Sequence, residues 1–140
     1  MRFMLMIKAT AESEAGELPS TELLTEMGKY NEELVKAGVL LAAEGLHASS
    51  KGARVKLAGK RRTVIDGPFA EAKELVAGFW LIEVGSKEEA VEWVKRCPCS
   101  GDQEAEIEIR QVFEAADFGD AATPEVRAAE AELRARTSGS

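Results

Sequence analysis

The sequence predicts an α+β fold in which helices cover one face of an antiparallel sheet. Three observations predict this class. Short apolar segments of strand length alternate with segments of helical periodicity. Their order is strand, helix, strand, hairpin, strand, helix, strand, so two similar units flank the hairpin. The 140 residues are enough to bury a core without disulfides or metals. This order is that of a ferredoxin-like sandwich.

In the first unit, residues 2–9 are apolar almost throughout and too short for a typical helix, which predicts a buried strand. After a polar loop, apolar residues at spacings of three and four predict a helix over residues 21–37. Residues 39–45 predict the second strand. Alternating residues in 53–57 and 62–65, separated by a glycine-containing turn, predict a β-hairpin.

The second unit begins with a strand predicted over residues 77–84. Ser86, with a glutamate three residues later, opens a helix that Pro98 ends. Residues 104–112 alternate strictly and predict a half-buried strand. We place the domain in residues 1–113 and a tail in residues 114–140. The tail carries one short helix, whose thin apolar stripe needs another surface to rest on.

A sheet with helices on one face leaves its other face uncovered. Residues such as Phe79 or Trp80 are expected to line that face. The tail helix could cover it, or a second copy of the chain could, and a homodimer is the prediction that we favour.

The amino-acid composition excludes several classes of function. Lys and Arg total 18 and Asp and Glu 25, a net charge of −7 that argues against nucleic-acid binding. No apolar run approaches the roughly 20 residues of a membrane helix, so no membrane partner is expected. The N-terminal apolar run is too short for a secretory signal. Cys97 and Cys99 offer no disulfide framework, which together with the missing signal predicts a cytoplasmic protein. One histidine excludes a multi-histidine metal site, and neither metal nor cofactor is predicted.

One pair of residues suggests general acid/base catalysis. His47 follows the second strand, and Asp66 opens the turn Asp66–Phe69 after the hairpin. A carboxylate beside an imidazole fixes its tautomer and favours the protonated ring, as a general base requires. Because a hairpin separates them, the two residues could return to one place. The alternative is a loop histidine and an aspartate that caps its own turn.

Four further residues are candidate ligand contacts: Ser49, Ser50, Arg54 and Phe69. The serines could hydrogen-bond a ligand or could simply form a loop. Arg54 belongs to the basic region 51–62, which could attract an anionic small molecule or could be a solvated hairpin. Phe69 could line the site or anchor the turn in the core.

The chain resembles the YciI-related proteins with a DGPF signature. The resemblance rests on residues 66–74 (DGPFAEAKE), supported by Gly45-Leu46-His47, by residues 77–80 (AGFW) and by segments in the second helix, the last strand and the tail. It implies a dimeric α/β-barrel protein of the ferredoxin-like class. It also implies that His47 and Asp66 match the histidine and aspartate proposed as the active-site pair of YciI-like relatives.

The resemblance implies no reaction, because the family has no established general activity. Genes of such proteins often neighbour those of extracytoplasmic-function sigma factors, which implies a regulatory setting. Three hypotheses therefore remain: a cofactor-independent enzyme that uses His47 and Asp66 for general acid/base chemistry, a non-catalytic ligand-binding or regulatory module, and a purely structural turn.

Overall fold

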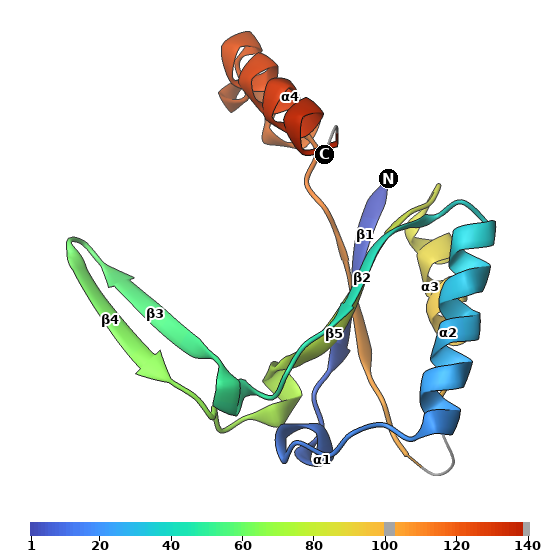
Figure 1. Cartoon of the computed structure of the whole chain (residues 1–140). Coiled ribbons are helices and arrows are strands. Elements are labelled where there is room, and N and C mark those ends of the chain that lie inside the picture. Colours follow the sequence, from blue (N-terminus) through green and yellow to red (C-terminus); the bar gives the residue numbers. More distant parts are fainter. Residues whose placement is uncertain (100–102, 139–140) are drawn as a thin grey trace.

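The computed structural model describes residues 1–99 and 103–138 (Figure 1). Its strands are β1 (Arg2–Lys8), β2 (Leu40–Gly45), β3 (Ala53–Ala58), β4 (Arg61–Asp66), β5 (Val76–Glu83) and β6 (Ile107–Gln111). Its α-helices are α1 (Ala11–Glu14), α2 (Thr21–Lys36), α3 (Lys87–Lys95) and α4 (Pro124–Ser138). Three short 3₁₀ helices complete it, η1 (Ser49–Lys51), η2 (Ala72–Glu74) and η3 (Ala115–Ala121).

Four strands form one antiparallel sheet in the order β2-β5-β1-β6. Helices α2 and α3 lie on one face of this sheet (Figure 1). This confirms the predicted ferredoxin-like α+β class. Within the single chain the sheet is open and does not close into a barrel. The predicted hairpin also forms, but β3 and β4 make a separate two-stranded sheet.

The core lies between the sheet and the two helices. Its buried residues come from alternate positions of β1 and β5, from the residue that follows β5 and from one side of each helix: Phe3, Leu5, Tyr30, Leu34, Trp80, Ile82, Val84 and Ala90. The Tyr30 hydroxyl donates to the carbonyl of Trp93 at 2.6 Å, which joins α2 to α3. The spacing of three and four along α2 therefore marks its buried side, as the sequence predicts.

The placement of Trp80 corrects one expectation. Trp80 lies on the helix side of the sheet, where its indole N–H donates to Asn31 at 2.8 Å. Phe79 is half-buried on the opposite face. Successive residues of a strand point to opposite faces, so only one of the two can line the open face.

The observed helices and strands also differ from the predicted ones in smaller ways, mainly in where they begin and end. The loop predicted after the first strand contains α1, whose Thr10 cap accepts the N–H of Ser13 at 3.1 Å. The last strand begins at Ile107, three residues later than the alternation predicts. No helix among residues 1–99 and 103–138 is long and apolar enough to cross a membrane.

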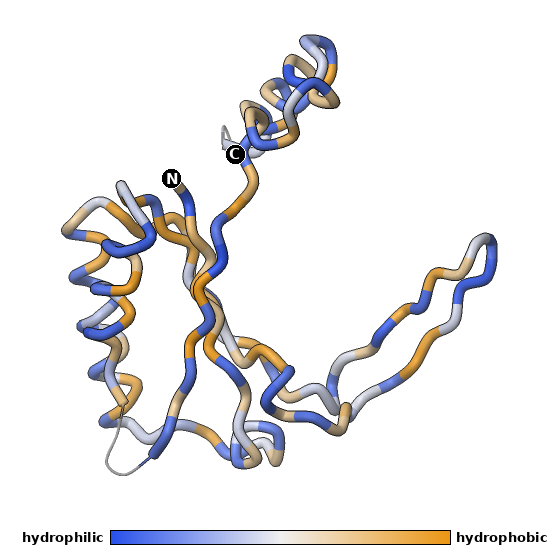
Figure 2. The backbone as a smooth tube through the Cα atoms, turned by 180° about the vertical axis from the view of Figure 1, so that it is seen from behind, coloured by the Kyte–Doolittle hydropathy of each residue, from blue (hydrophilic) through white to orange (hydrophobic). Residues whose placement is uncertain are grey.

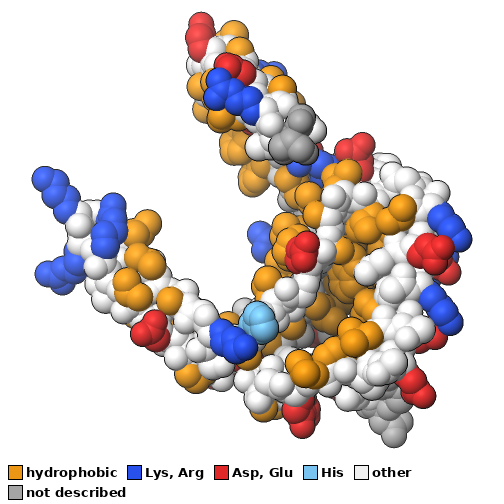
Figure 3. Space-filling view, viewed as in Figure 1, with side chains coloured by type: hydrophobic (Ala, Val, Ile, Leu, Met, Phe, Trp, Pro, Cys, Tyr) orange, Lys and Arg blue, Asp and Glu red, His pale blue; other side chains and the backbone are white. Residues whose placement is uncertain are grey.

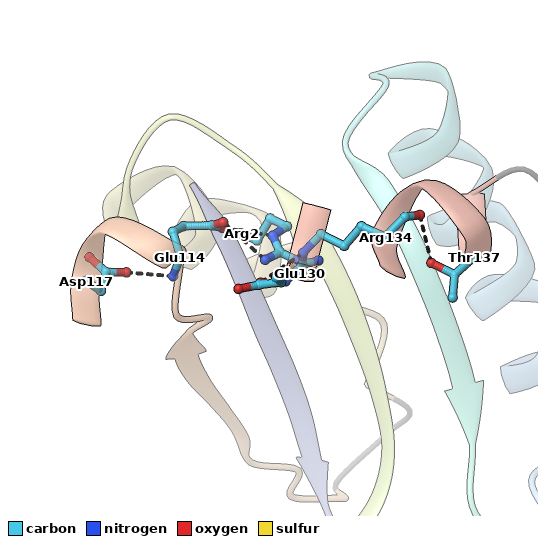
Figure 4. Close-up of polar contacts among 6 residues, drawn as sticks. All are labelled: Arg2, Glu114, Asp117, Glu130, Arg134 and Thr137. Carbon is cyan, nitrogen blue, oxygen red and sulfur yellow. Dashed lines mark hydrogen bonds and ion pairs between the residues drawn. The ribbon is translucent and has the colours of Figure 1, made fainter. Parts of the chain in front are cut away.

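Two parts of the chain project from the sheet, on the side away from α2 and α3 (Figures 1 and 2). One is the β3–β4 hairpin, and the other is the tail with η3 and α4. The start of the tail is fastened to β1 by Arg2, whose guanidinium donates two hydrogen bonds to Glu114 at 2.9 and 3.2 Å (Figure 4). Helix α4 itself has no buried residue.

Candidate functional site

The loop that carries His47 lies directly against the turn that carries Asp66. Ser49, two residues after His47, accepts a hydrogen bond on its hydroxyl from the N–H of Phe69 at 3.0 Å. The N–H of Gly67 donates to the carbonyl of Gly52 at 3.1 Å. These two bonds join the segment 47–52 to the segment 66–69, so the two ends of the hairpin lie together.

Gly67 allows this close approach. A Cβ atom at this position would lie 1.8 Å from the carbonyl oxygen of Ser49 and 2.6 Å from its carbonyl carbon. Both are backbone atoms and cannot rotate away. The glycine of the Asp66–Phe69 turn is therefore required by packing against Ser49.

Glu14 completes the contact, and sequence reasoning missed it. Its carboxylate accepts the N–H of Ser49 at 3.0 Å and also the Ser49 hydroxyl. The hydroxyl of Ser49 thus donates to Glu14 and accepts from Phe69. We call the three residues Glu14, Ser49 and Phe69 the loop clip. No sequence pattern signals it, because Glu14 belongs to a four-residue helix and lies 35 positions from Ser49.

His47 and Asp66 themselves are exposed. Neither a hydrogen bond nor an ion pair joins the two side chains, both of which lie in the described part of the chain. The structure therefore brings their two loops together through the backbone and Ser49.

The other residues that we predict to contact a ligand lie in different surroundings. The guanidinium of Arg54 lies over the ring of Phe69, 3.8 Å from its centroid, so these two candidates contact each other. Such a cation–π contact holds the start of β3 against the Asp66–Phe69 turn. Ser50 is exposed on η1. Of the two serines, only Ser49 has a defined role here, and that role is to hold the loops.

A separate cavity lies between the N-terminal half of α2 and the helix-facing side of the sheet. Its volume is about 410 Å³, within the range of small-molecule sites. Its walls are mainly apolar and come from α2, β1, β2, β5 and the segment before α2; they include Leu23, Leu24, Met27, Ala43 and Trp80. Asn31 adds an amide to this wall. Neither His47 nor Asp66 lines it.

The two cysteines differ in burial. Burial, together with the neighbouring Cys99, raises the pKa of the Cys97 thiol to about 11. Cys97 packs against the core, whereas Cys99 is exposed. Among the residues that the structure describes, no group of three His, Cys, Asp or Glu side chains could hold a metal ion.

The open antiparallel sheet, its two covering helices and the projecting hairpin with its clipped loops define a small α+β protein. Residues 1–116 match the family model of the YCII-related domain, so the chain belongs to the YCII-related family. The chain is also similar to the uncharacterized protein R00369 of Rhizobium meliloti (strain 1021). The two are 27% identical over 88 residues, which cover 63% of this chain and 71% of that protein.

Proposed function

We propose that this protein acts on a small organic molecule without a cofactor, with His47 as the general acid or base. Asp66 is the carboxylate that orients the imidazole. The observation that supports this proposal is the loop clip, because it holds the segment of His47 against the segment of Asp66. His47 and Asp66 are exposed on adjoining loops, so their side chains can rotate into contact, and we expect them to pair in solution.

The chemistry open to this pair is proton transfer. A neutral imidazole accepts a proton at one nitrogen while its other N–H donates to the carboxylate, which fixes the tautomer. Isomerisation or hydrolysis of a small substrate needs no more than such a group in the right position. The basic region 51–62, which begins at the hairpin base, favours a substrate with negative charge.

The cavity between α2 and the sheet favours a second candidate function, non-catalytic binding of a small, largely apolar molecule. Asn31 would supply the polar contact, since its side-chain oxygen is used by Trp80 and its NH₂ group can donate. A regulatory module linked to an extracytoplasmic-function sigma factor, which the family resemblance implies, would use such a cavity to sense its ligand.

The single histidine makes the first candidate directly testable. Nitrogen NMR of His47 reports which ring nitrogen carries the proton. We expect one tautomer to dominate in the native protein and the tautomer populations to change in Asp66→Asn. The matched control is Asp120→Asn, which removes an exposed carboxylate in the tail. Equal tautomer populations in the native protein and Asp66→Asn would contradict the pairing.

A dye titration tests the second candidate. The fluorophore anilinonaphthalene sulfonate, whose aromatic rings bind apolar cavities, is expected to bind the native protein and His47→Gln equally. Leu24→Glu, which places a charge in the cavity wall, is expected to weaken that binding. Dye binding to Leu24→Glu that equals binding to the native protein would contradict the proposal that the cavity binds a small molecule.

A further inference from the structure

The projecting hairpin concentrates positive charge in an acidic chain. Residues 51–62 contain six of the 18 Lys and Arg of the chain and none of its 25 Asp and Glu. None of these six forms an ion pair with a carboxylate in residues 1–99 and 103–138. Figure 3 shows Lys and Arg side chains gathered at the free end of the hairpin. Cations that no carboxylate of their own chain neutralises favour an anionic partner.

The cations and the apolar residues of the hairpin lie on opposite faces. Residues that pair directly across two antiparallel strands share a face, and successive residues alternate between faces. One face therefore carries Arg54, Lys56 and Arg61, and the other carries the direct pair Val55 and Val64. All five side chains are exposed.

The outer edge of β3 has unpaired backbone groups. β3 and β4 form a two-stranded sheet, so neither outer edge bonds to another described strand. The N–H of Gly67 donates to the carbonyl of Gly52, and bonded pairs alternate with non-bonded pairs along an antiparallel ladder. Val55 and Leu57 fall on non-bonded pairs and turn their N–H and C=O groups outward. Such an edge is a template for a further strand.

These features together define the chemistry of the partner. We infer that the outer edge of β3 binds an extended segment of a partner protein in which acidic and apolar residues alternate. Alternate residues of a strand are about 6.8 Å apart, so successive carboxylates would lie beside Arg54 and Lys56. The apolar residues between them would lie beside Val55 and Leu57. This mode of recognition joins backbone hydrogen bonds to side-chain selection.

The edge of β4 fits such a segment less well. On the basic face β4 carries Arg61 at its start and then the uncharged Thr63 and Ile65, so only one carboxylate would meet a cation. The inference goes beyond the proposed function and holds whether or not His47 is catalytic.

Two other anionic partners fit the hairpin less well. Proteins that bind single-stranded nucleic acid combine cations with aromatic rings on which bases stack, and residues 51–66 contain no aromatic residue. A lipid surface that took up the apolar face would also take up the unpaired backbone groups of both edges, which hydrocarbon cannot satisfy. An extended acidic segment uses the cations, the apolar face and the edge together.

A synthetic peptide tests the inference. The probe is a fluorescein-labelled, end-blocked peptide of sequence EVEVEVE, and its fluorescence anisotropy is measured as native protein is added. We expect saturable binding that weakens as salt is added, because exposed charges are screened. The control peptide EEEEVVV has the same composition without the alternation. We expect its Kd to be at least roughly tenfold higher, because it cannot place carboxylates and apolar residues on opposite faces.

Two pairs of variants locate the contact. Lys56→Glu should raise the Kd of EVEVEVE roughly tenfold, because like charges then face each other. Lys87→Glu makes the same change in net charge at an exposed position of α3 and should leave the Kd unchanged.

The second pair tests the edge itself. Val55→Pro removes an outward N–H and no bond to β4, and should raise the Kd roughly tenfold. Val64→Pro makes the same change at the directly opposite position, on the other edge, and should leave the Kd unchanged. Circular dichroism checks that each variant is folded. Because Lys56 is an exposed side chain, Lys56→Glu tests the contact without altering the backbone of the hairpin.

Several results would overturn the inference. A native protein that shows no saturable binding of EVEVEVE at about 1 mM would exclude the site. Equal binding of the two peptides, or equal effects of Val55→Pro and Val64→Pro, would show that charge attracts the peptide without strand addition at β3. A short single-stranded oligonucleotide or phosphatidylglycerol vesicles that bind more tightly than EVEVEVE, and lose this binding in Lys56→Glu, would assign the basic face to that partner instead.

Discussion

Gly67→Ala should open the contact between the two site loops. The added Cβ would lie 1.8 Å from the Ser49 oxygen, about 1.6 Å closer than an ordinary contact. The Ser49 backbone must therefore move, which breaks its two hydrogen bonds to Glu14 and the one from Phe69. Lost bonds of this kind, together with overpacking, give a destabilisation of roughly 2–4 kcal/mol.

Urea unfolding followed by tryptophan fluorescence measures the loss, and amide exchange at Phe69 shows whether the loops separate. The matched control is Gly28→Ala in the exposed interior of α2, where an added Cβ meets nothing within 4 Å. That change should stabilise the protein by about 0.5–1 kcal/mol, because alanine favours the helix. A Gly67→Ala protein as stable as the native one, with its Phe69 amide still protected, would refute the reasoning.

Further predictions concern the core, the cysteines and the tail. Leu34→Ala should lower the free energy of unfolding in urea by about 2–5 kcal/mol, because Leu34 is fully buried. With a thiol reagent near pH 8, Cys99 should react quickly and Cys97 slowly. A pKa of about 11 leaves only about a thousandth of the Cys97 thiol ionised at that pH. Equal reaction rates would contradict the burial of Cys97. The hydrogen bonds from Arg2 lower the pKa of Glu114 below its ordinary 4.5. The stability that this bond gives should thus be complete above pH 4.5 and lost as the pH falls through the lowered pKa of Glu114. Amide exchange in α4, measured against pH, should follow this loss in the native protein and not in Glu114→Gln. The same pH dependence in Glu114→Gln would show that another group causes it.

The fold was predictable because each element carries its own local pattern. The spacing of apolar residues in α2 identifies its buried side, and Ser20 caps its start through the N–H of Leu23. The side of the sheet on which Trp80 lies was not predictable. Residues 77–82 are apolar or glycine throughout, so alternation cannot show which side meets the helices. The contacts that distinguish the two sides, such as the hydrogen bond from Trp80 to Asn31, come from another element.

The candidate site was predictable only in part, for a similar reason. The turn residues Asp66–Phe69 and the hairpin before them indicate that two loops meet. The residue that fastens them, Glu14, becomes adjacent only through tertiary structure. The cavity was also missed, because its walls are ordinary apolar residues of α2 and the sheet, and only their incomplete packing creates the space.

The hairpin and the candidate site are physically linked. The base of the hairpin is closed by the Gly67–Gly52 hydrogen bond, one residue from Asp66, and the guanidinium of Arg54 at the start of β3 lies over the ring of Phe69. A contact that fixes the hairpin would therefore also restrict the Asp66–Phe69 turn.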